Sequence, residues 1–307
     1  MTAGASPAPA GLGATRRRYG EDAVRVVLAL FALVSVLTTV GILVALLLPA
    51  VQFFGDVSPW DFLTGTTWAP LFEPSSFGVL PLLAGTLSVT FWAALVCMPF
   101  GLGAAIYLSE YAGSRARNVL KPALEVLAGV PTVVFGYFAL TFVTPLLRDL
   151  GLDVEIFNSL SAGLVMGVML IPTVASLSED AMAAVPRALR YGAYALGSTK
   201  LQVATRIVVP AAVSGIVAAF VLGLSRAIGE TMIVLIAAGQ QPTLSFDPRA
   251  AVETMTAFIA ATGAGDVPTG SLEYKTIFAV GLTLFVLTFV MNVVSIRLVR
   301  RFREVYE

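Results

Sequence analysis

Histidine is missing from the 307 residues of this chain, and cysteine occurs only once. A chain without histidine has no imidazole to ligate a metal ion or to act as a general acid or base. The single cysteine, Cys97, cannot form a disulfide within the chain, and its apolar surroundings favour a packed thiol. The sequence therefore predicts neither a metal site nor an internal disulfide.

Charged residues are scarce as well. They make up 12% of the chain, hydrophobic residues make up 57%, and the mean hydropathy is +0.88, whereas soluble domains carry about 25% charged residues. The 19 basic and 19 acidic residues cancel, so no net positive field indicates a nucleic acid partner. Since the charges lie between long apolar runs, the composition is typical of a protein that crosses a lipid bilayer several times.

Six apolar segments are long enough to cross a bilayer as helices, because a hydrocarbon core of about 30 Å needs about 20 helical residues. The segments are 26–54, 77–108, 126–147, 156–178, 207–239 and 276–296. They predict an all-α, polytopic membrane protein with six transmembrane helices.

Basic residues gather on one side of these segments, in the N-terminal arm, two loops and the C-terminal tail. They are Arg16, Arg17, Arg18, Arg25, Arg115, Arg117, Lys121, Arg187, Arg190, Lys200, Arg206, Arg297, Arg300, Arg301 and Arg303. The opposite side has Arg148, Arg249 and Lys275. By the positive-inside rule, both termini are expected in the cytoplasm.

The expected organisation has four parts. Residues 1–23 are rich in small residues, Pro and Gly, and are expected to form a disordered cytoplasmic tail. Residues 24–76 comprise the first transmembrane helix and an outer loop. Residues 77–298 form a core of five transmembrane helices that includes a cytoplasmic loop at 180–210, and residues 299–307 form a basic cytoplasmic tail.

The cytoplasmic loop is too long for a turn and too polar to cross a membrane. Residues 187–196 favour a short amphipathic helix with Leu189, Ala193 and Leu196 on one face, and Gly197 is a helix stop signal. Such a helix either docks on a partner or lies flat at the membrane interface. "GAYALGSTK" superficially matches a phosphate loop, but Lys200 is misplaced and no strand precedes it, so nucleotide binding is not expected.

The outer loops at 55–76 and 240–275 are the other long connections. The first carries the aromatic residues Trp60, Phe62, Trp68 and Phe72, a residue type that commonly anchors a protein at the membrane interface. In the second, residues 248–262 have helical spacing, which predicts a re-entrant or surface helix.

The fifth segment is unusual because "VLGLSRAIGETMIVLIAAG" carries Arg226 and Glu230 within an apolar run. A charge in hydrocarbon costs at least about 2.5 kcal/mol. On one continuous helix, residues four apart share a face, so the two side chains are expected to meet. Counted along a straight helix from Ala211, Arg226 lies about 22 Å from the cytoplasmic boundary, past the midplane.

Two interpretations of this pair remain open. The pair is either a salt bridge that locks neighbouring helices together, or part of a path in which Arg226 meets an anion. A guanidinium group matches two oxygens of an oxyanion at once. In the second interpretation Glu230 holds Arg226 and competes with the anion, so that the anion is released.

The cytoplasmic loop resembles the signature of type I ABC importer permeases, Glu-Ala-Ala, three residues, Gly, nine residues, Ile, one residue, Leu-Pro. Gly197 is followed at the same spacing by Ile207 and Pro210, whereas Tyr191 and Gly192 replace the first two residues. The resemblance implies the type I permease fold and a coupling helix that docks on an ATPase subunit. The implied coupling residues are Tyr191, Gly192, Ala193, Gly197, Ile207 and Pro210.

The stretch "LSRAIGETM" resembles the corresponding helix of phosphate-specific ABC importer permeases. "FGVLPLLAGTLSVT", "GLGAAIYLSEYA", "LAGVPTVVFGYFAL" and "AVPRALRYGAYALGS" agree with that family, and together they cover most of residues 77–239. "GETMIV" is closer to the C-type than to the A-type subunit. In this family the Arg and Glu of this helix are implicated in phosphate passage, which implies that role for Arg226 and Glu230.

The resemblance also implies the partners: a second permease subunit, two ATPase subunits and an extracytoplasmic phosphate-binding protein. For this last partner, the resemblance supports the aromatic first outer loop as a landing surface. The chain is then a multi-pass protein of the bacterial inner membrane, in contact with lipid. It is not an enzyme and holds no cofactor, whereas its partners use ATP and Mg²⁺. The alternatives are a permease for sulfate or molybdate, a secondary transporter or a membrane-embedded enzyme. A secondary transporter would show inverted internal repeats, and none is evident.

Overall fold

The computed structural model describes residues 19–302. Most of the predicted N-terminal tail, residues 1–18, and residues 303–307 of the predicted C-terminal tail lie outside the described residues. The first helix begins at Tyr19 and the last ends at Phe302, so residues 19–23 and 299–302 are helical. The chain divides into two units, Met1–Leu48 and Pro49–Glu307.

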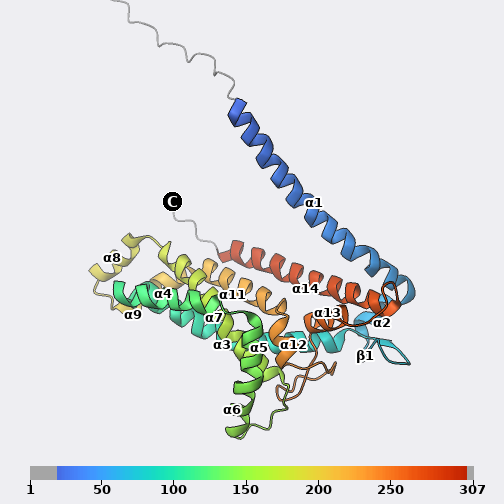
Figure 1. The fold of residues 1–307 in the computed structure, drawn as a ribbon. Coiled ribbons are helices and arrows are strands. Elements are labelled where there is room, and N and C mark those ends of the chain that lie inside the picture. The colour runs from blue at the N-terminus through green and yellow to red at the C-terminus, as the bar shows by residue number, and fades with distance from the viewer. Residues whose placement is uncertain (1–18, 303–307) are drawn as a thin grey trace, which may run out of the picture. The chain divides into compact units, whose positions relative to one another are not determined.

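Helices dominate the described part of the chain (Figure 1). The elements are α1 (Tyr19–Asp56), α2 (Pro59–Thr64), β1 (Trp68–Ala69), β2 (Ser76–Phe77), α3 (Leu80–Ile106), the π-helix η1 (Tyr107–Tyr111), α4 (Ser114–Ala128), α5 (Thr132–Phe138), the π-helix η2 (Ala139–Val143), α6 (Thr144–Asp149), α7 (Ser159–Ala183), α8 (Arg187–Ala195), α9 (Lys200–Val203), the π-helix η3 (Ala204–Val208), α10 (Val209–Ala211), α11 (Val213–Ile228), α12 (Met232–Ala237), α13 (Met255–Ala264) and α14 (Leu272–Phe302). β1 and β2 pair antiparallel, with Trp68 opposite Phe77.

The predicted membrane architecture is confirmed. Four helical stretches are long and apolar enough to cross a membrane: they lie in α1, in α3 with η1, in α7 and in α14. The number rises to six if each of two bent pairs of helices counts as one span. In one pair α4 is followed by Thr132–Asp149 at an angle of 88°, and in the other Lys200–Ala211 is followed by α11 at 72°.

The predicted third span at 126–147 begins too early. α4 ends at Ala128, and Pro131 precedes the next helix. Proline lacks an N–H group and disfavours helical backbone in the preceding residue, so the chain changes direction here. The apolar segment that follows, Thr132–Asp149, is about 27 Å long. α4 is a separate amphipathic helix that carries basic residues.

The predicted fifth span at 207–239 is not one helix. The chain bends at Ala212, α11 then runs to Ile228, and three residues separate it from α12. The break contains Gly229, a residue that weakens a helix. Arg226 therefore belongs to the last turn of α11, and Glu230 lies in the break.

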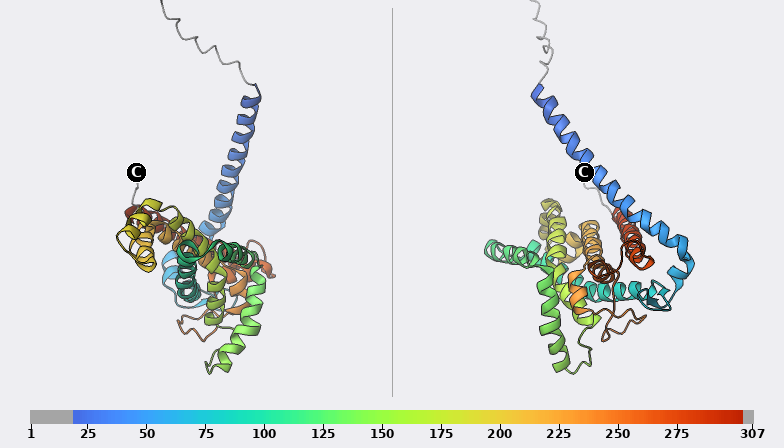
Figure 2. Two further views of the ribbon diagram at one scale, coloured as in Figure 1. Left: turned by 90° about the vertical axis from the view of Figure 1, so that its left-hand side faces the viewer. Right: turned by 45° about the vertical axis from the view of Figure 1, so that its right-hand side comes forward.

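Close helix packing forms the core of the second unit. α3, α7 and α11 contact one another (Figures 1 and 2). An added Cβ at Gly167 of α7 would lie 2.8 Å from the carbonyl oxygen of Ala93 on α3. On α11, Gly215 faces Ala181 and Gly223 faces Val174, so α11 runs antiparallel to α7. Glycine lets these backbones approach closely.

The two ends of the second unit carry different elements. α8 and α9 lie at one end, and α2, β1 and α13 lie toward the other (Figure 1). By the predicted orientation, the end with α8 is cytoplasmic. At the outer end, residues 251–258 are buried. Of the predicted helix at 248–262, only the part from Met255 is helical, because Thr254 caps α13 by accepting a hydrogen bond from the N–H of Ala257.

Candidate functional site

Arg226 reaches across from α11 to α7. Its Nη1 donates a hydrogen bond to Oγ1 of Thr173 at 3.4 Å, and its side chain is exposed in the isolated chain. Thr173 lies about 21 Å from the start of α7 and about 15 Å from its end. The depth predicted from the sequence assumed a straight helix, whereas the contact places the guanidinium nearer the middle of α7.

Glu230 contacts the start of α12 and not Arg226, the partner predicted from the sequence. It is buried, and its Oε1 accepts hydrogen bonds from the N–H groups of Met232, at 3.1 Å, and Ile233, at 3.5 Å. These groups belong to the first turn of α12, where N–H groups have no partner within the helix and attract negative charge. Glu230 therefore caps α12.

The predicted contact between Arg226 and Glu230 is wrong. No ion pair within residues 19–302 joins them, and none involves Arg226. The contact depended on a continuous helix, and α11 ends before Glu230. The guanidinium thus contacts a neutral hydroxyl, and its other N–H donors remain available to an anion.

Thr173 and Thr256 are neighbours of this pair that the sequence did not single out. The hydroxyl of Thr256 donates to the carbonyl oxygen of Glu230 at 2.7 Å, which ties the α11–α12 break to the outer-loop helix α13. No spacing rule connects Thr256 or Thr173 with residues so far along the chain. Their threonine side chains resemble many others in apolar helices.

The predicted cytoplasmic helix is present as α8. Gly197 has a φ of +81°, and the N–H groups of Gly197 and Ser198 donate to the carbonyls of Tyr194 and Ala193. These two bonds form a Schellman motif, which confirms Gly197 as the stop signal. Lys200 begins α9 and lies over the ring of Tyr111, so this segment is not a phosphate loop.

The predicted coupling residues divide between the two faces of the loop. Tyr191, Gly192 and Pro210 are exposed, whereas Ala193 is buried against the ends of α3, α7 and α11. Ile207 packs against the same cluster. Leu196, predicted to share a face with Ala193, is 88% exposed because it follows the last turn of α8.

Arg190 fixes α8 to the transmembrane helices, a role that sequence reasoning missed. Its Nη2 lies 3.1 Å from Oε1 of Glu110 in η1. It also donates to the carbonyls of Met182, at 2.7 Å, and Val185, at 2.6 Å. The pair is largely buried. Glu110 lies in the stretch "GLGAAIYLSEYA", which resembles the phosphate permease family. Its partner Arg190 is 80 residues further along the chain, however, so no local pattern connects the two.

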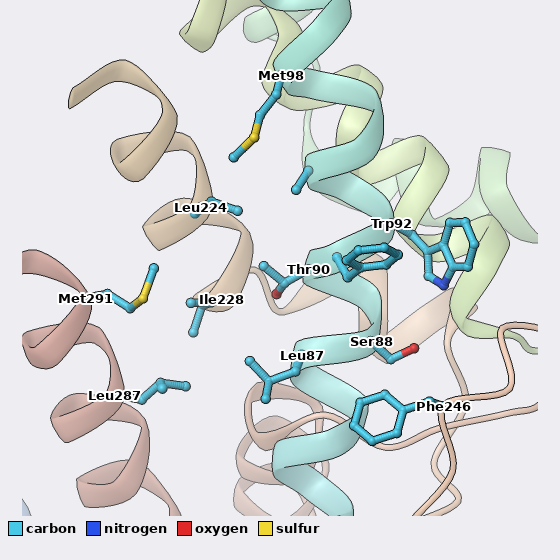
Figure 3. Close-up of a pocket in the computed structure, with 12 residues that line it drawn as sticks. Leu87, Ser88, Thr90, Trp92, Met98, Leu224, Ile228, Phe246, Leu287 and Met291 are labelled. Carbon is cyan, nitrogen blue, oxygen red and sulfur yellow. The ribbon is translucent and has the colours of Figure 1, made fainter. Parts of the chain in front are cut away.

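A large cavity on the face of α11 opposite Arg226 has no charged lining. It measures about 610 Å³ and is lined by residues of α3, α11 and α14, including Leu87, Leu224, Ile228, Leu287 and Met291 (Figure 3). Its hydroxyls have other partners: Thr90 donates to the carbonyl of Thr86, and Ser88 donates to Ser159. An apolar cavity of this kind gives an oxyanion nothing to bind.

A charged cavity lies beside the second outer loop. Arg148, Asp153, Glu155, Asp247 and Arg249 line a cavity of about 360 Å³. The pKa of Asp247 is lowered to about 2 because its carboxylate accepts hydrogen bonds from Arg249.

The aromatic residues predicted in the first outer loop divide in two. Trp60 and Phe72 are exposed, whereas Phe62 and Trp68 are buried in a cluster with Phe258. Only Trp60 and Phe72 can therefore act as anchors or landing points.

Residues 97–304 match the family of binding-protein-dependent transport system inner membrane components. Among curated proteins, a probable ABC transporter permease of Bacillus subtilis, YqgH, is 35% identical, and the match covers 89% of each chain. The phosphate transport system permease proteins PstC of Pasteurella multocida and PstC 1 of Mycobacterium tuberculosis are 31% and 35% identical. Their matches cover 86% of this chain and 89% of the former, and 73% of this chain and 73% of the latter.

Solved structures show the same fold at low identity. A chain of a bacterial alginate ABC transporter has a TM-score of 0.64 at 18% identity, and the match covers 93% of this chain and 98% of that chain. A chain of the MetNI methionine ABC transporter has a TM-score of 0.55 at 18% identity, and the match covers 74% of this chain and 95% of that chain. The chain therefore belongs to the family of inner membrane components of binding-protein-dependent transport systems and has the type I ABC importer permease fold.

Proposed function

We propose that this chain is a permease subunit of an ABC importer for inorganic phosphate. The observation that carries the proposal is the match to several PstC proteins over most of the chain. The placement of Arg226 supports it, because a guanidinium at midspan has no carboxylate partner within the described residues. A charge held at such a cost is usually functional.

Arg226 is the residue proposed to meet phosphate in the path. Its planar donors match two oxygens of a tetrahedral oxyanion. Glu230 contributes indirectly: it holds the first turn of α12 and sets a negative charge beyond the end of α11. Since Thr173 is a weak, neutral partner, phosphate displaces it readily, and Thr173 can return when phosphate leaves.

The cytoplasmic face supplies the coupling surface in this proposal. Tyr191 and Gly192 are exposed on α8, where they can contact an ATPase subunit, and Gly197 ends the helix. Ala193 and Ile207 pack beneath α8, whereas Pro210 is exposed. Two ATPase subunits would hydrolyse ATP with Mg²⁺, so this chain performs no catalysis and needs no cofactor of its own.

The remaining partners follow from the same proposal. A second permease subunit completes the path, and an extracytoplasmic phosphate-binding protein delivers the anion. The charged outer cavity around Asp247 and Arg249, together with the exposed Trp60 and Phe72, offers that protein polar and aromatic contacts. Closure of the ATPase pair moves α8, and the helices that hold α8 alternate between outward and inward access.

Isolation of the tagged chain from its native membrane tests the proposal. We expect it to bring down an ATPase and a second six-span permease. In proteoliposomes that also receive the binding protein, phosphate should stimulate ATP hydrolysis. Stimulation by sulfate or molybdate, and not by phosphate, would show that the substrate is one of those anions. Anion uptake without any ATPase would contradict the proposal that the chain is part of an ABC importer.

A further inference from the structure

A polar cavity lies next to Thr173, between α4 and α7. It measures about 240 Å³, and its polar lining comes from Lys121 and Glu125 of α4 and from Thr173, Ser176 and Glu179 of α7. The three α7 residues are spaced to share one face of the helix. They run for about 9 Å from Thr173 toward the cytoplasmic end of α7.

Two basic residues share one buried carboxylate at the cytoplasmic end of this cavity. Glu179 has a side chain that is only 3% exposed. Nη2 of Arg117 lies 2.9 Å from its Oε1, and Nζ of Lys121 lies 2.8 Å from its Oε2. Both basic side chains are partly exposed. The positive charges of Arg117 and Lys121 are matched by Glu179 and by the exposed Glu125, which lines the cavity together with Lys121.

The cluster retains unused hydrogen-bond donors. Nε of Arg117 is buried and has no hydrogen-bond partner. The exposed hydroxyl of Ser176 lines the cavity and makes no hydrogen bond within residues 19–302. Oε2 of Glu179 also lacks a hydrogen-bond partner, although Nζ of Lys121 lies beside it. A buried donor without a partner costs free energy that an incoming acceptor would recover. An oxyanion supplies such acceptors and the charge that Lys121 and Arg117 favour.

Thr173 joins this cavity to Arg226. Its hydroxyl accepts the hydrogen bond from Arg226 and also lines the cavity. An anion that leaves the guanidinium toward the cytoplasm therefore meets Thr173, then Ser176, and then the basic pair at Glu179. The large apolar cavity on the opposite side of α11 offers no such sequence of donors.

We infer that the cavity is a second oxyanion site, through which the anion passes from Arg226 to the cytoplasm. Lys121 and Arg117 exchange Glu179 for the anion and then return to Glu179, which keeps the anion from being held too tightly. The inference rests on the proposed function, since it assumes that an oxyanion passes Arg226.

Thiol protection in the complete transporter tests occupancy of this site directly. In a Cys97→Ala background, a Ser176→Cys variant places a thiol in the cavity, and a Leu177→Cys variant places one on the next residue, which is exposed but outside the cavity. An anionic thiol reagent is added from the cytoplasmic side. We expect millimolar phosphate to slow labelling of the Ser176→Cys variant at least threefold and to leave the Leu177→Cys variant unchanged.

The outcomes separate the site from its substrate. Protection by sulfate or molybdate but not by phosphate would support the site and overturn phosphate as the substrate. Equal labelling of the Ser176→Cys variant with and without every oxyanion would overturn the site and leave the proposed function standing.

A purely structural role for the ion pairs, which join α4 to α7, makes a different prediction for uptake. We expect Lys121→Gln to lower the maximal uptake rate about tenfold and Lys121→Arg to retain most of it, because only the latter keeps the charge. Adding Glu179→Gln to Lys121→Gln removes the unpaired carboxylate. A structural pair predicts that this double variant recovers the wild-type rate, and such recovery would contradict the site.

Discussion

Glu230 illustrates how a single residue can differ from its expected role. Its carboxylate caps α12 rather than pairing with Arg226. Glu230→Gln retains an oxygen that can accept the same hydrogen bonds, whereas Glu230→Ala leaves the N–H groups of Met232 and Ile233 without a partner. Loss of a cap costs about 1 kcal/mol. We expect Glu230→Ala to lower both the thermal unfolding midpoint and phosphate uptake more than Glu230→Gln does.

Equal effects of the two substitutions at Glu230 would contradict the capping role. They would indicate that the negative charge itself is required, as the sequence-based pairing assumed. Uptake and unfolding are measured on the same purified complex, so that loss of the fold is separated from loss of transport.

Glu253 is a buried carboxyl in the outer loop, and it predicts a pH dependence. Burial raises its pKa to about 7, above the usual value of about 4.3. Below both values the folded and unfolded states are protonated alike. Between them the folded state binds the proton more tightly, so stability falls as pH rises, by at most about 4 kcal/mol above pH 7.

Glu253→Gln removes this contribution. We expect the variant to gain thermal stability over the wild type at pH 8 and to show little difference at pH 4.5. The wild type serves as the control at each pH, because other groups titrate in the same range. A constant difference across the range would show that Glu253 stays ionised and solvated.

The identity of the candidate residues could be read from the sequence better than their contacts. Arg226 stands out because it is a charge in an apolar run, and Gly197 stands out because a helical pattern ends there. The cap at Glu230 and the contact with Thr173 depend on where the neighbouring backbone lies. Local patterns do not contain that information.

At the scale of elements, glycines determine how closely α3 and α7 pack. Gly167→Ala brings a Cβ to 2.8 Å from the carbonyl of Ala93 and 2.6 Å from the Cβ of Val96, so backbone must move. Overpacking of this kind costs about 1–3 kcal/mol. We expect a lower unfolding midpoint for this variant. Gly103→Ala on α3 is the matched control, since nothing lies within 4 Å of its added Cβ, and an equal loss there would contradict the argument.

The clamp between α8 and the transmembrane helices predicts a separation of ATP hydrolysis from transport. Arg190→Met removes the bonds to Glu110, Met182 and Val185. α8 can then move without α3 and α7. We expect phosphate uptake to fall about tenfold while ATP hydrolysis by the assembled complex continues. The measurement is the ratio of anions transported to ATP hydrolysed.

A charge swap tests the clamp further. In Arg190→Glu with Glu110→Arg, the pair can re-form, although the new glutamate cannot donate to the carbonyls of Met182 and Val185. We expect partial recovery of the transport ratio relative to either single substitution. A single Arg190→Met variant with an unchanged ratio would show that α8 transmits its movement through other contacts.

The lengths of the apolar runs predicted the membrane-spanning segments well, but they did not predict where the helices break within those segments. All six apolar segments correspond to described helices, because burial in lipid requires a run of about 20 apolar residues. Within the predicted third span, Pro131 marks in the sequence the place where a helix ends. The break after Ile228 has only Gly229 as a local signal, and it is stabilised by Glu230 and by Thr256 from a distant loop.

At the scale of the whole molecule, the described contacts link the outer face to the cytoplasmic face. α13 holds the α11–α12 break through Thr256, and Arg226 extends from α11 to α7. α7 in turn contacts the basic residues of α4 through Glu179, and Arg190 of α8 through the carbonyl of Met182. In the proposed importer, movement of α8 during ATP hydrolysis would therefore act on the helices that surround Arg226. Transport by alternating access requires a connection of this kind.

Phosphate uptake by the Arg226→Gln variant tests the central claim most directly. The complete complex, with its ATPase subunits and binding protein, is reconstituted in proteoliposomes, and uptake of labelled phosphate is followed with ATP inside. We predict that Arg226→Gln lowers uptake at least a hundredfold while the subunits still assemble, and that Arg226→Lys retains a measurable part. Uptake by an assembled Arg226→Gln complex at the wild-type rate would contradict the account.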